Sequence, residues 1–307
     1  MASLPYHLVN AFTGASPHSG NQAAVVLFPD EADARINATF FLATARDFGF
    51  SETAFLVPLG DGSDAEPSYR IRFWTPAVEV PLCGHATLAS AYTVLYAVHP
   101  AASAVRFDTH VRPVRCVRGE EGTVVLDMPG HVAAEPEPEA ADKLRARLFA
   151  AAPALRPADV LRLARVTGFG DGDRVVFELS ADVDLEKLAI DPAHFNARDT
   201  AQVAVTQLAG AGATLRINSR VFCPFWGIPE DPVTGAAHTV LGPYYLTGVG
   251  SEGARAVFQG DLGSASIDAR QVSPRGGAMR VSLAEGGRVL LTGTAARWAD
   301  GALHAVE

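Results

Sequence analysis

Apolar residues along the first half of the chain follow two periods, one typical of strands and one typical of helices. Short β-branched and aromatic runs predict strands, whereas residues 30–47 have the spacing of an amphipathic helix. The predicted strands are 6–12, 23–28, 50–57, 69–74, 105–116 and 123–128, and the predicted helices are 30–47 and 84–98. The first half ends at about residue 128.

The second half begins with a segment that has no apolar period. Residues 131–142 are rich in Pro, Glu and Ala and are interpreted as a linker. Strands are predicted within 165–179, at 203–208, at 214–222 and repeatedly after 254, starting around Val257, with helices at 185–195 and 234–246. Pro243 must kink the last helix or limit it to its first two turns. We expect domains at 1–130 and 131–307, the final strand being a candidate for return to the first domain.

Two strand-to-helix turns, at 79–86 and 230–237, share one pattern. The first reads EVPLCGHA and the second EDPVTGAA, with Glu, Pro, an aliphatic residue, a small residue, Gly and Ala at the same spacing. Pro extends the residue before it, and Gly84 and Gly235 allow the backbone to approach a ligand closely. Further matches at an offset of about 150 residues favour two halves of one design.

Each repeated turn delivers the N-terminus of a helix. The first N–H groups of a helix have no intrahelical partner and carry partial positive charge, so each turn is suited to receive a carboxylate. A single copy is more simply an ordinary turn. The duplication, together with the acid, His and Asp beside the turns, favours two helix ends that hold a small acidic molecule from both sides.

Composition narrows the partners and the compartment. The 307 residues are 48% hydrophobic and 19% charged with a net charge of -9, so we expect a soluble globular protein that binds neither nucleic acid nor an anionic membrane. Residues 1–6 lack the features of a signal peptide, no stretch of membrane-spanning length follows, and we expect a cytoplasmic protein. Cys83, Cys116 and Cys223 are too widely spaced for a structural zinc site or a disulfide framework.

Motifs for cofactor chemistry are missing from the sequence. Its two lysines, Lys143 and Lys187, lie in polar segments away from the repeated turns, which argues against pyridoxal phosphate. The chain has neither a Walker loop nor a complete dinucleotide fingerprint. We therefore expect chemistry done by side chains, without a cofactor or a metal.

Three titratable residues are candidates for that chemistry. Glu52 lies in a mostly apolar strand, where desolvation is expected to raise its pKa toward neutrality, so that it can take and return a proton. His85 begins a helix whose positive end favours a neutral imidazole. Asp231 precedes Pro232 and projects beside the second helix end. Taken one at a time, each is explained as well or better as a surface, cap or turn residue.

Several sequence blocks resemble the phenazine-biosynthesis PhzF-like family. They are GNQAAV at 20–25, SETAF at 51–55, FWTP at 73–76 with EVPLCGHAT at 79–87, and EDPVTG at 230–235 followed by Ala237 and His238. Gln271 with SPRGG at 273–277 resembles the late block of the PBLD-like branch. The blocks occur in order over nearly the whole chain.

The resemblance implies a diaminopimelate-epimerase-like fold of class α/β (α+β). Two pseudo-symmetric domains would each have a mixed sheet wrapped round a central helix, with the active site in the cleft between them and a homodimer as the assembly. The resemblance also implies a cofactor-free isomerase, in which Glu52 shuttles a proton with the aid of His85 and Asp231.

Four further positions are assigned to substrate binding: Asn21, Gly84, Gly235 and Ala236. Asn21 is expected to make a polar contact in the cleft, and N–H groups near the two glycines are implied to hold a substrate carboxylate. Ala236 stands where the family commonly has Ser, and Gln22 where it commonly has Pro. Loss of the Ser hydroxyl leaves the proton shuttle intact but argues against the substrate of the phenazine pathway.

We therefore predict an isomerase that moves a proton between carbons of a small carboxylate-bearing metabolite. The alternative is a binding or regulatory protein that keeps the anion site without turnover. A metal-dependent hydrolase using Cys83, His85 and His238 is a weaker hypothesis because of their spacing. Cys83 is interpreted as a small turn residue, since Thr234 in the matching position excludes a two-thiol racemase mechanism.

Overall fold

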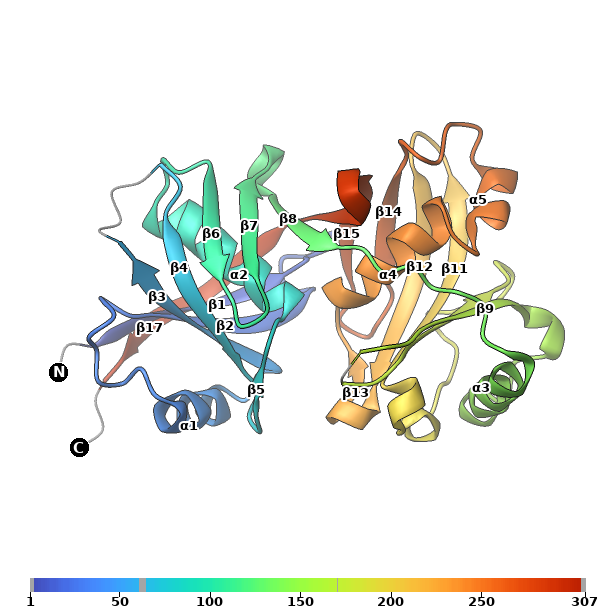
Figure 1. The fold of residues 1–307 in the computed structure, drawn as a ribbon, viewed down its shortest axis with the longest axis horizontal. Coiled ribbons are helices and arrows are strands. Elements are labelled where there is room, and N and C mark those ends of the chain that lie inside the picture. The colour runs from blue at the N-terminus through green and yellow to red at the C-terminus, as the bar shows by residue number, and fades with distance from the viewer. Residues whose placement is uncertain (1–2, 61–64, 170, 305–307) are drawn as a thin grey trace. The chain divides into compact units, whose positions relative to one another are not determined.

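The computed structural model describes residues 3–60, 65–169 and 171–304 (Figure 1). The chain divides into unit 1, residues 1–127 with 292–307, and unit 2, residues 128–291. Met1 and Ala2, which belong to the N-terminal segment compared with a signal peptide, lie outside the described residues. Within the described part of the chain, every helix is too short or too polar to cross a membrane.

Unit 1 is a mixed sheet with two helices. The strands are β1 (Leu4–Ala11), β2 (Asn21–Leu27), β3 (Glu52–Leu59), β4 (Ser68–Trp74), β5 (Glu79–Val80), β6 (Ala104–Asp108), β7 (Pro113–Arg118), β8 (Val124–Pro129) and β17 (Ala295–Leu303). The helices are α1 (Ala38–Phe48) and α2 (Gly84–Thr93), which continues as a π-helical turn to Val98. Pairing is antiparallel for β17 with β1, β1 with β2, and β3 with β4, and parallel for β2 with β3 and β4 with β6. Strands β6, β7 and β8 then follow antiparallel, and β5 pairs antiparallel with β4.

Unit 2 repeats this topology. The strands are β9 (Val160–Val166), β10 (Arg174–Leu179), β11 (Gln202–Ala211), β12 (Leu215–Cys223), β13 (Ile228–Asp231), β14 (Ser266–Gln271), β15 (Gly277–Ala284) and β16 (Arg288–Gly293), and the helices are α3 (Pro138–Ala151), α4 (Gly235–Leu246) and α5 (Ser251–Val257). Strand β9 pairs antiparallel with β10, β10 parallel with β11, β11 antiparallel with β12, β12 parallel with β14, and β14 antiparallel with β15. Strand β13 pairs antiparallel with β12. Strands β9, β10, β11, β12, β14 and β15 therefore pair in the same way as β1, β2, β3, β4, β6 and β7, and β13 corresponds to β5. The internal duplication predicted from the repeated turns is present in the fold.

Strand register aligns the two copies residue by residue. Phe55 of β3 lies opposite Arg72 of β4, and Val205 of β11 lies opposite Arg220 of β12. Counting back along each strand places Gln202 in the position of Glu52, and both residues begin their strands. The copy of the predicted acid in unit 2 is therefore an amide.

Helices α2 and α4 are buried almost all round. Eight of the ten residues of α2 and eleven of the twelve of α4 are buried. Small residues such as Ala86 and Ala89 allow the strands to approach α2, which contacts β1, β2, β3, β7 and β17. In Figure 1, α2 and α4 each lie against the strands of their own unit. A helix enclosed in this way has little room for charged side chains, and these two sequences contain no Asp, Glu, Lys or Arg.

Helices α1 and α3 form a second layer in their units. In unit 1, Phe41 of α1 stacks on Phe55 of β3 with ring centroids 4.3 Å apart, and Ala45 packs in the same cluster. In unit 2, Leu144 and Leu148 of α3 join a buried cluster with residues of β10, β11 and β12. Each sheet therefore has a core on both faces.

The segment predicted as a linker, residues 131–142, is structured instead. Ala134 forms a β-bridge with Arg165, and α3 begins at Pro138. Pro suits the first turn of a helix because its missing N–H would have no intrahelical partner there. Interpreting Pro and Glu as linker residues was wrong because they form a helix start.

Four other predicted elements differ from the observed ones. Residues 185–195 form turns that end in a 3-10 turn, Pro192–Phe195, rather than a helix, and the strand predicted around Val257 is the end of α5. Helix α1 begins at Ala38, eight residues later than predicted. Helix α4 runs through Pro243 to Leu246, so the proline does not stop it after two turns.

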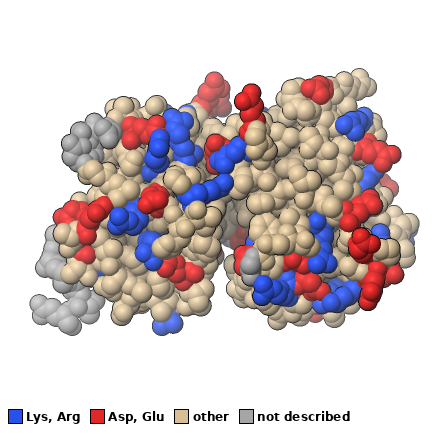
Figure 2. Space-filling view, viewed as in Figure 1, with Lys and Arg blue, Asp and Glu red and all other residues tan. Residues whose placement is uncertain are grey.

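Charged side chains of both signs lie interspersed on each unit in the face shown in Figure 2. Ion pairs join many charged side chains of the described residues, such as Arg115 with Glu66 in unit 1, and Lys143 and Arg147 with Asp199 in unit 2. Exposed pairs of this kind contribute little to stability. On the described part of this face they break up any single-sign surface.

Candidate active site

The first repeated turn is anchored by an ion pair between its two short strands. Arg72 of β4 pairs with Glu79 of β5, and the chain then turns through Pro81 into α2, which begins at Gly84. Cys83 occupies the N-cap position without capping the helix through its side chain. The first N–H groups of α2 therefore have no side-chain cap and are available to an anion.

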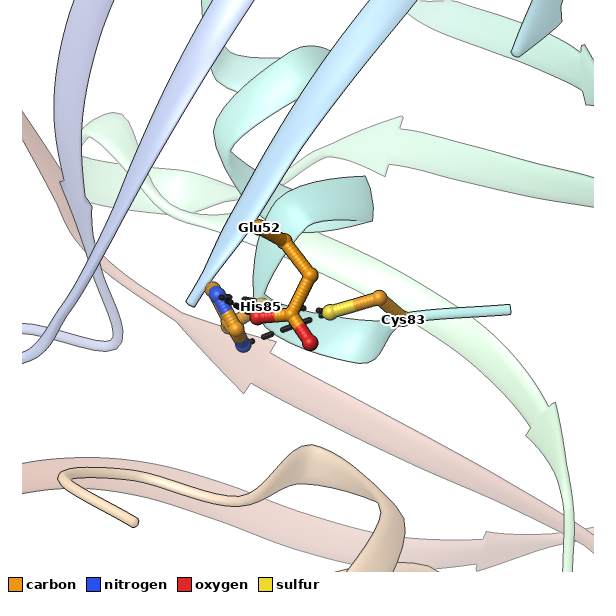
Figure 3. A group of neighbouring side chains, drawn as sticks. All are labelled: Glu52, Cys83 and His85. Carbon is orange, nitrogen blue, oxygen red and sulfur yellow. Dashed lines mark hydrogen bonds and ion pairs between the residues drawn. The ribbon is translucent and has the colours of Figure 1, made fainter. Parts of the chain in front are cut away.

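Glu52 and His85 meet at this helix start. Oε2 of Glu52 lies 3.1 Å from Nε2 of His85, and the two residues are only 8% and 5% exposed. Oε2 has no well-formed hydrogen bond among the described residues. Figure 3 shows the carboxylate of Glu52, on β3, and the imidazole of His85, on α2, pointing toward each other.

Three further side chains surround the imidazole. Nδ1 of His85 lies 3.2 Å from Nδ2 of Asn21 and 3.3 Å from Sγ of Cys83, and Nε2 lies 3.4 Å from Oγ of Ser51. The predicted residues Asn21, Glu52 and His85 are thus brought together. Cys83 and Ser51 also belong to the site. Sequence reasoning set Cys83 aside and missed Ser51, although one is two residues from His85 and the other is next to Glu52.

The protonation states differ from those predicted. Burial alone would raise the pKa of Glu52, but the charge of His85 and hydrogen bonds from His85, Ser51 and Cys83 lower it below its ordinary value. Burial would lower the pKa of His85, but the neighbouring Cys83 sulfur and Glu52 carboxylate hold it well above the usual range. The expected raised pKa of Glu52 and neutral state of His85 are therefore wrong, because each group has the other as a partner. Both shifts favour the charged form of each group in the presence of the other.

The thiol of Cys83 holds its proton more strongly than an exposed cysteine does. Burial and the negative charge of Glu52 raise the pKa of Cys83 above its ordinary value. A neutral, buried thiol is a poor nucleophile. Its Sγ, a carboxylate oxygen of Glu52 and a ring nitrogen of His85 nevertheless lie within 4.8 Å of one another, so the three side chains offer a donor set for a metal ion.

The second repeated turn positions Asp231 in unit 2. The carboxylate is largely buried, and its Oδ2 accepts a hydrogen bond of 2.5 Å from Oγ1 of Thr234. Gln271 clamps the same turn, since its Nε2 donates to the carbonyl of Asp231 at 2.6 Å and its Oε1 accepts from the N–H of Thr234 at 2.9 Å. In the sequence, Gln271 was noted only because it resembles part of a family block. No pattern in the sequence indicated that it would hydrogen-bond to this turn.

Helix α4 begins at Gly235, directly after Thr234, and has no side-chain cap. Ala236 is exposed, whereas the rest of the helix is buried. A residue in the first turn of a buried helix that remains open to solvent is accessible to a small ligand. The predicted positions Asp231, Gly235 and Ala236 thus lie together at one helix end.

His238 has a structural role in unit 2. Its Nδ1 lies 2.8 Å from the carbonyl oxygen of Thr234 and its Nε2 lies 3.4 Å from Oγ of Ser219. The side chain is fully buried, and burial lowers its pKa to about 4. A neutral histidine with both ring nitrogens engaged offers no free donor, which argues against the hydrolase hypothesis.

Comparison with known proteins assigns the family. The model of the phenazine biosynthesis-like protein family, PhzC-PhzF, matches residues 9–301. A phenazine biosynthesis-like domain-containing protein of Homo sapiens is 31% identical over 327 residues, covering 98% of this chain and 99% of its own. An uncharacterized isomerase of Pseudomonas aeruginosa is 34% identical over 298 residues, covering 96% of this chain and 97% of its own.

A solved structure shows the same fold over the full length. The crystal structure of a phenazine biosynthesis protein of the PhzF family from Enterococcus faecalis matches with a TM-score of 0.75 at 28% identity, covering 99% of this chain and 100% of that one. Two nearly full-length relatives above 30% identity and a family match across both units lead to one assignment. The chain belongs to the phenazine biosynthesis-like PhzC-PhzF family.

Proposed function

We propose that this protein is a cofactor-independent isomerase that moves a proton between carbons of a small carboxylate-bearing metabolite. The observation that carries the proposal is the carboxylate of Glu52, buried 3.1 Å from His85 at the start of α2. An ionised carboxylate in a buried site is suited to accept a proton from carbon. The relative named an isomerase agrees with this class of reaction.

Substrate binding would make Glu52 a stronger base. In the free protein the charge of His85 keeps the pKa of Glu52 low. A substrate carboxylate brought near Glu52 would act in the opposite direction, because two like charges at short distance raise each other's pKa. Glu52 would therefore gain proton affinity at the moment when the substrate is in place.

Charge that develops on the substrate needs stabilisation. Removing a proton next to a carboxylate spreads negative charge onto the carboxylate oxygens, and helix N–H groups stabilise such charge. The uncapped starts of α2 at Gly84 and of α4 at Gly235 are candidates for this role. We include Asp231, held by Thr234 and Gln271, as a residue that aids Glu52 without itself transferring the proton.

The internal duplication favours a double-bond shift over inversion of a centre. Inversion needs a proton-transfer group on each face of the reacting carbon. The unit 2 positions that match Glu52 and Cys83 carry Gln202 and Thr234, neither of which exchanges protons near neutral pH. In our proposal Glu52 returns the proton to a different carbon on the same face.

The test is deuterium uptake in heavy water from a panel of small unsaturated carboxylates. We expect the wild-type protein to label one of them, and Glu52→Gln to slow labelling by roughly 10²–10⁴-fold while its circular dichroism spectrum stays unchanged. The exposed Glu120→Gln is the matched control and should label like the wild type. Undiminished labelling by Glu52→Gln would remove Glu52 from the mechanism. Retention of a carboxylate by the wild-type protein without labelling would support the alternative, a binding protein.

A further inference from the structure

The cluster of Glu52, Cys83 and His85 combines three kinds of metal donor in one buried place. A carboxylate oxygen, a sulfur and an imidazole nitrogen lie within 4.8 Å of one another (Figure 3). We propose that this cluster is a binding site for a divalent transition metal ion, with Zn²⁺ as the preferred ion. Bound metal would prevent proton transfer at Glu52, and this consequence rests on the proposed function. The metal binding itself does not depend on the proposed function.

The donor separations fit a tetrahedral ion. Zn–N and Zn–O bonds of about 2.0 Å and a Zn–S bond of about 2.3 Å require ligand atoms roughly 3.3–3.5 Å apart. Nε2 of His85 lies 3.1 Å from Oε2 of Glu52 and 4.0 Å from Sγ of Cys83. Sγ and the carboxylate oxygen lie within 4.8 Å of each other, so the Cys83 side chain must move inward to complete the set, which leaves a fourth position open as in catalytic zinc sites.

Asn21 supplies the outer contact that such a site needs. A histidine that binds metal through one ring nitrogen usually donates the other N–H to an acceptor. The amide of Asn21 lies 3.2 Å from Nδ1 of His85. Rotating that amide by half a turn presents its Oδ1 as the acceptor, and the oxygen and nitrogen ends of an Asn side chain have nearly the same shape.

Charge and ligand chemistry favour a transition metal over Mg²⁺ or Ca²⁺. Sulfur and imidazole ligands suit Zn²⁺, Co²⁺ and Cu²⁺, whereas Mg²⁺ and Ca²⁺ take oxygen ligands. On binding, the Cys83 thiol and the His85 imidazolium release their protons to water, and the two anionic ligands then balance the dication. The positive end of the α2 dipole repels a cation, but its partial charge is smaller than the combined negative charge of the Glu52 carboxylate and the Cys83 thiolate.

Unit 2 serves as an internal reference. The positions that match the cluster there are Gln202, Thr234 and Ala236, which supply no carboxylate, thiolate or imidazole. The proposal therefore assigns a single ion per chain, to unit 1.

The experiment titrates the metal-free protein with Co²⁺ and follows optical absorption, then displaces Co²⁺ with Zn²⁺. We expect a sulfur-to-cobalt charge-transfer band that saturates at one ion per chain and disappears as Zn²⁺ is added. Cys83→Ala should lose the band, and Cys116→Ala, which removes another buried thiol of unit 1, should keep it. Glu52→Gln, which preserves the shape of the side chain, should weaken Zn²⁺ binding by roughly tenfold or more.

Two outcomes would overturn the proposal. One is the lack of saturable binding at one ion per chain in the wild-type protein, and the other is a band of equal intensity in Cys83→Ala. Circular dichroism of each variant shows whether it is folded, and Glu52→Gln gives an answer even if Cys83→Ala is unstable. Because the titration uses no substrate, its failure leaves the proposed isomerase activity unaffected.

Discussion

At the start of α2 in unit 1 stand Cys83 and His85, and at the start of α4 in unit 2 stand Thr234 and Ala236. The strands before these helices pair in the same way, and each turn is anchored by an Arg–Glu ion pair, Arg72–Glu79 in one and Arg220–Glu230 in the other. What differs is the titratable chemistry, which is concentrated in unit 1. The duplication therefore separates two features: the backbone that presents a helix end is kept in both copies, and the Cys and His side chains at that helix end occur in one.

The largest expected effect comes from removing the imidazole of His85, since the matching position at the helix start of unit 2 has no histidine. His85→Gln should slow deuterium exchange by roughly 10²–10⁴-fold, because Glu52 loses the cation that keeps it ionised and oriented. The exposed His304→Gln should leave the rate unchanged. Exchange by His85→Gln at the wild-type rate would mean that His85 does not assist Glu52 in proton transfer, although the two side chains are close.

The next largest effect is a loss of unfolding free energy when one of the two ion pairs that anchor the turns is broken. The Arg220 side chain is 10% exposed and also donates to the carbonyl of Leu188, whereas Arg72 is 27% exposed. Arg220→Met should cost about 3–5 kcal/mol of unfolding free energy, because it leaves Glu230 largely buried and unpaired. Arg72→Met should cost about 1 kcal/mol. Urea denaturation measures both, and equal losses would contradict the difference in burial.

A smaller effect concerns His238, the buried histidine that only unit 2 has after its helix start. In the unfolded chain it takes up a proton below pH 6.5, but in the folded protein only below about 4, so unfolding binds a proton between these values. Stability should therefore fall as the pH drops from 6.5 toward 4, by about 3 kcal/mol in total from this residue.

The check on His238 is the pH dependence of unfolding free energy in the wild type and in His238→Gln. Gln can keep the contacts with Thr234 and Ser219 but takes up no proton. Carboxylates contribute equally to both proteins, so the difference between the two curves isolates His238. Parallel curves would show that His238 is not neutral in the folded state.

The smallest effect is expected where the chain departs from its family. Ala236→Ser should change stability by less than about 0.5 kcal/mol, since the residue is exposed. The added hydroxyl at the start of α4 should strengthen binding of a hydroxylated or acidic ligand roughly fivefold, the value of one hydrogen bond of about 1 kcal/mol. Calorimetric titration with the labelled carboxylate measures the change, and weaker binding would argue that Ala236 lies outside the ligand contact.

Features carried by local sequence were predictable. Both repeated turns, the helices after them, and the contact of Glu52, His85 and Asn21 followed from motif spacing and from the family resemblance. The protonation states did not follow, because the argument for each group used its own burial or its own helix end. The distance of 3.1 Å between Glu52 and His85 is a property of the packed fold.

Two other features could not be predicted because they also depend on the packed fold. Gln271 is distant in sequence from the turn that it clamps, and its hydrogen bonds to that turn exist only once β14 pairs with β12. The segment 185–195 has helical spacing but lies over the unit 2 core as turns, with Leu185 and Phe195 buried in the cluster of α3. Tertiary packing overrode the local preference there.

The return of β17 to pair with β1 has a consequence for synthesis on the ribosome. Unit 2 is one uninterrupted segment of the chain, whereas unit 1 is assembled from both ends. Until residues 295–303 have left the exit tunnel, β1 lacks its neighbour and offers an open backbone edge to other nascent chains. Unit 2 should therefore mature first, and unit 1, which contains the cluster of Glu52, Cys83 and His85, should close last.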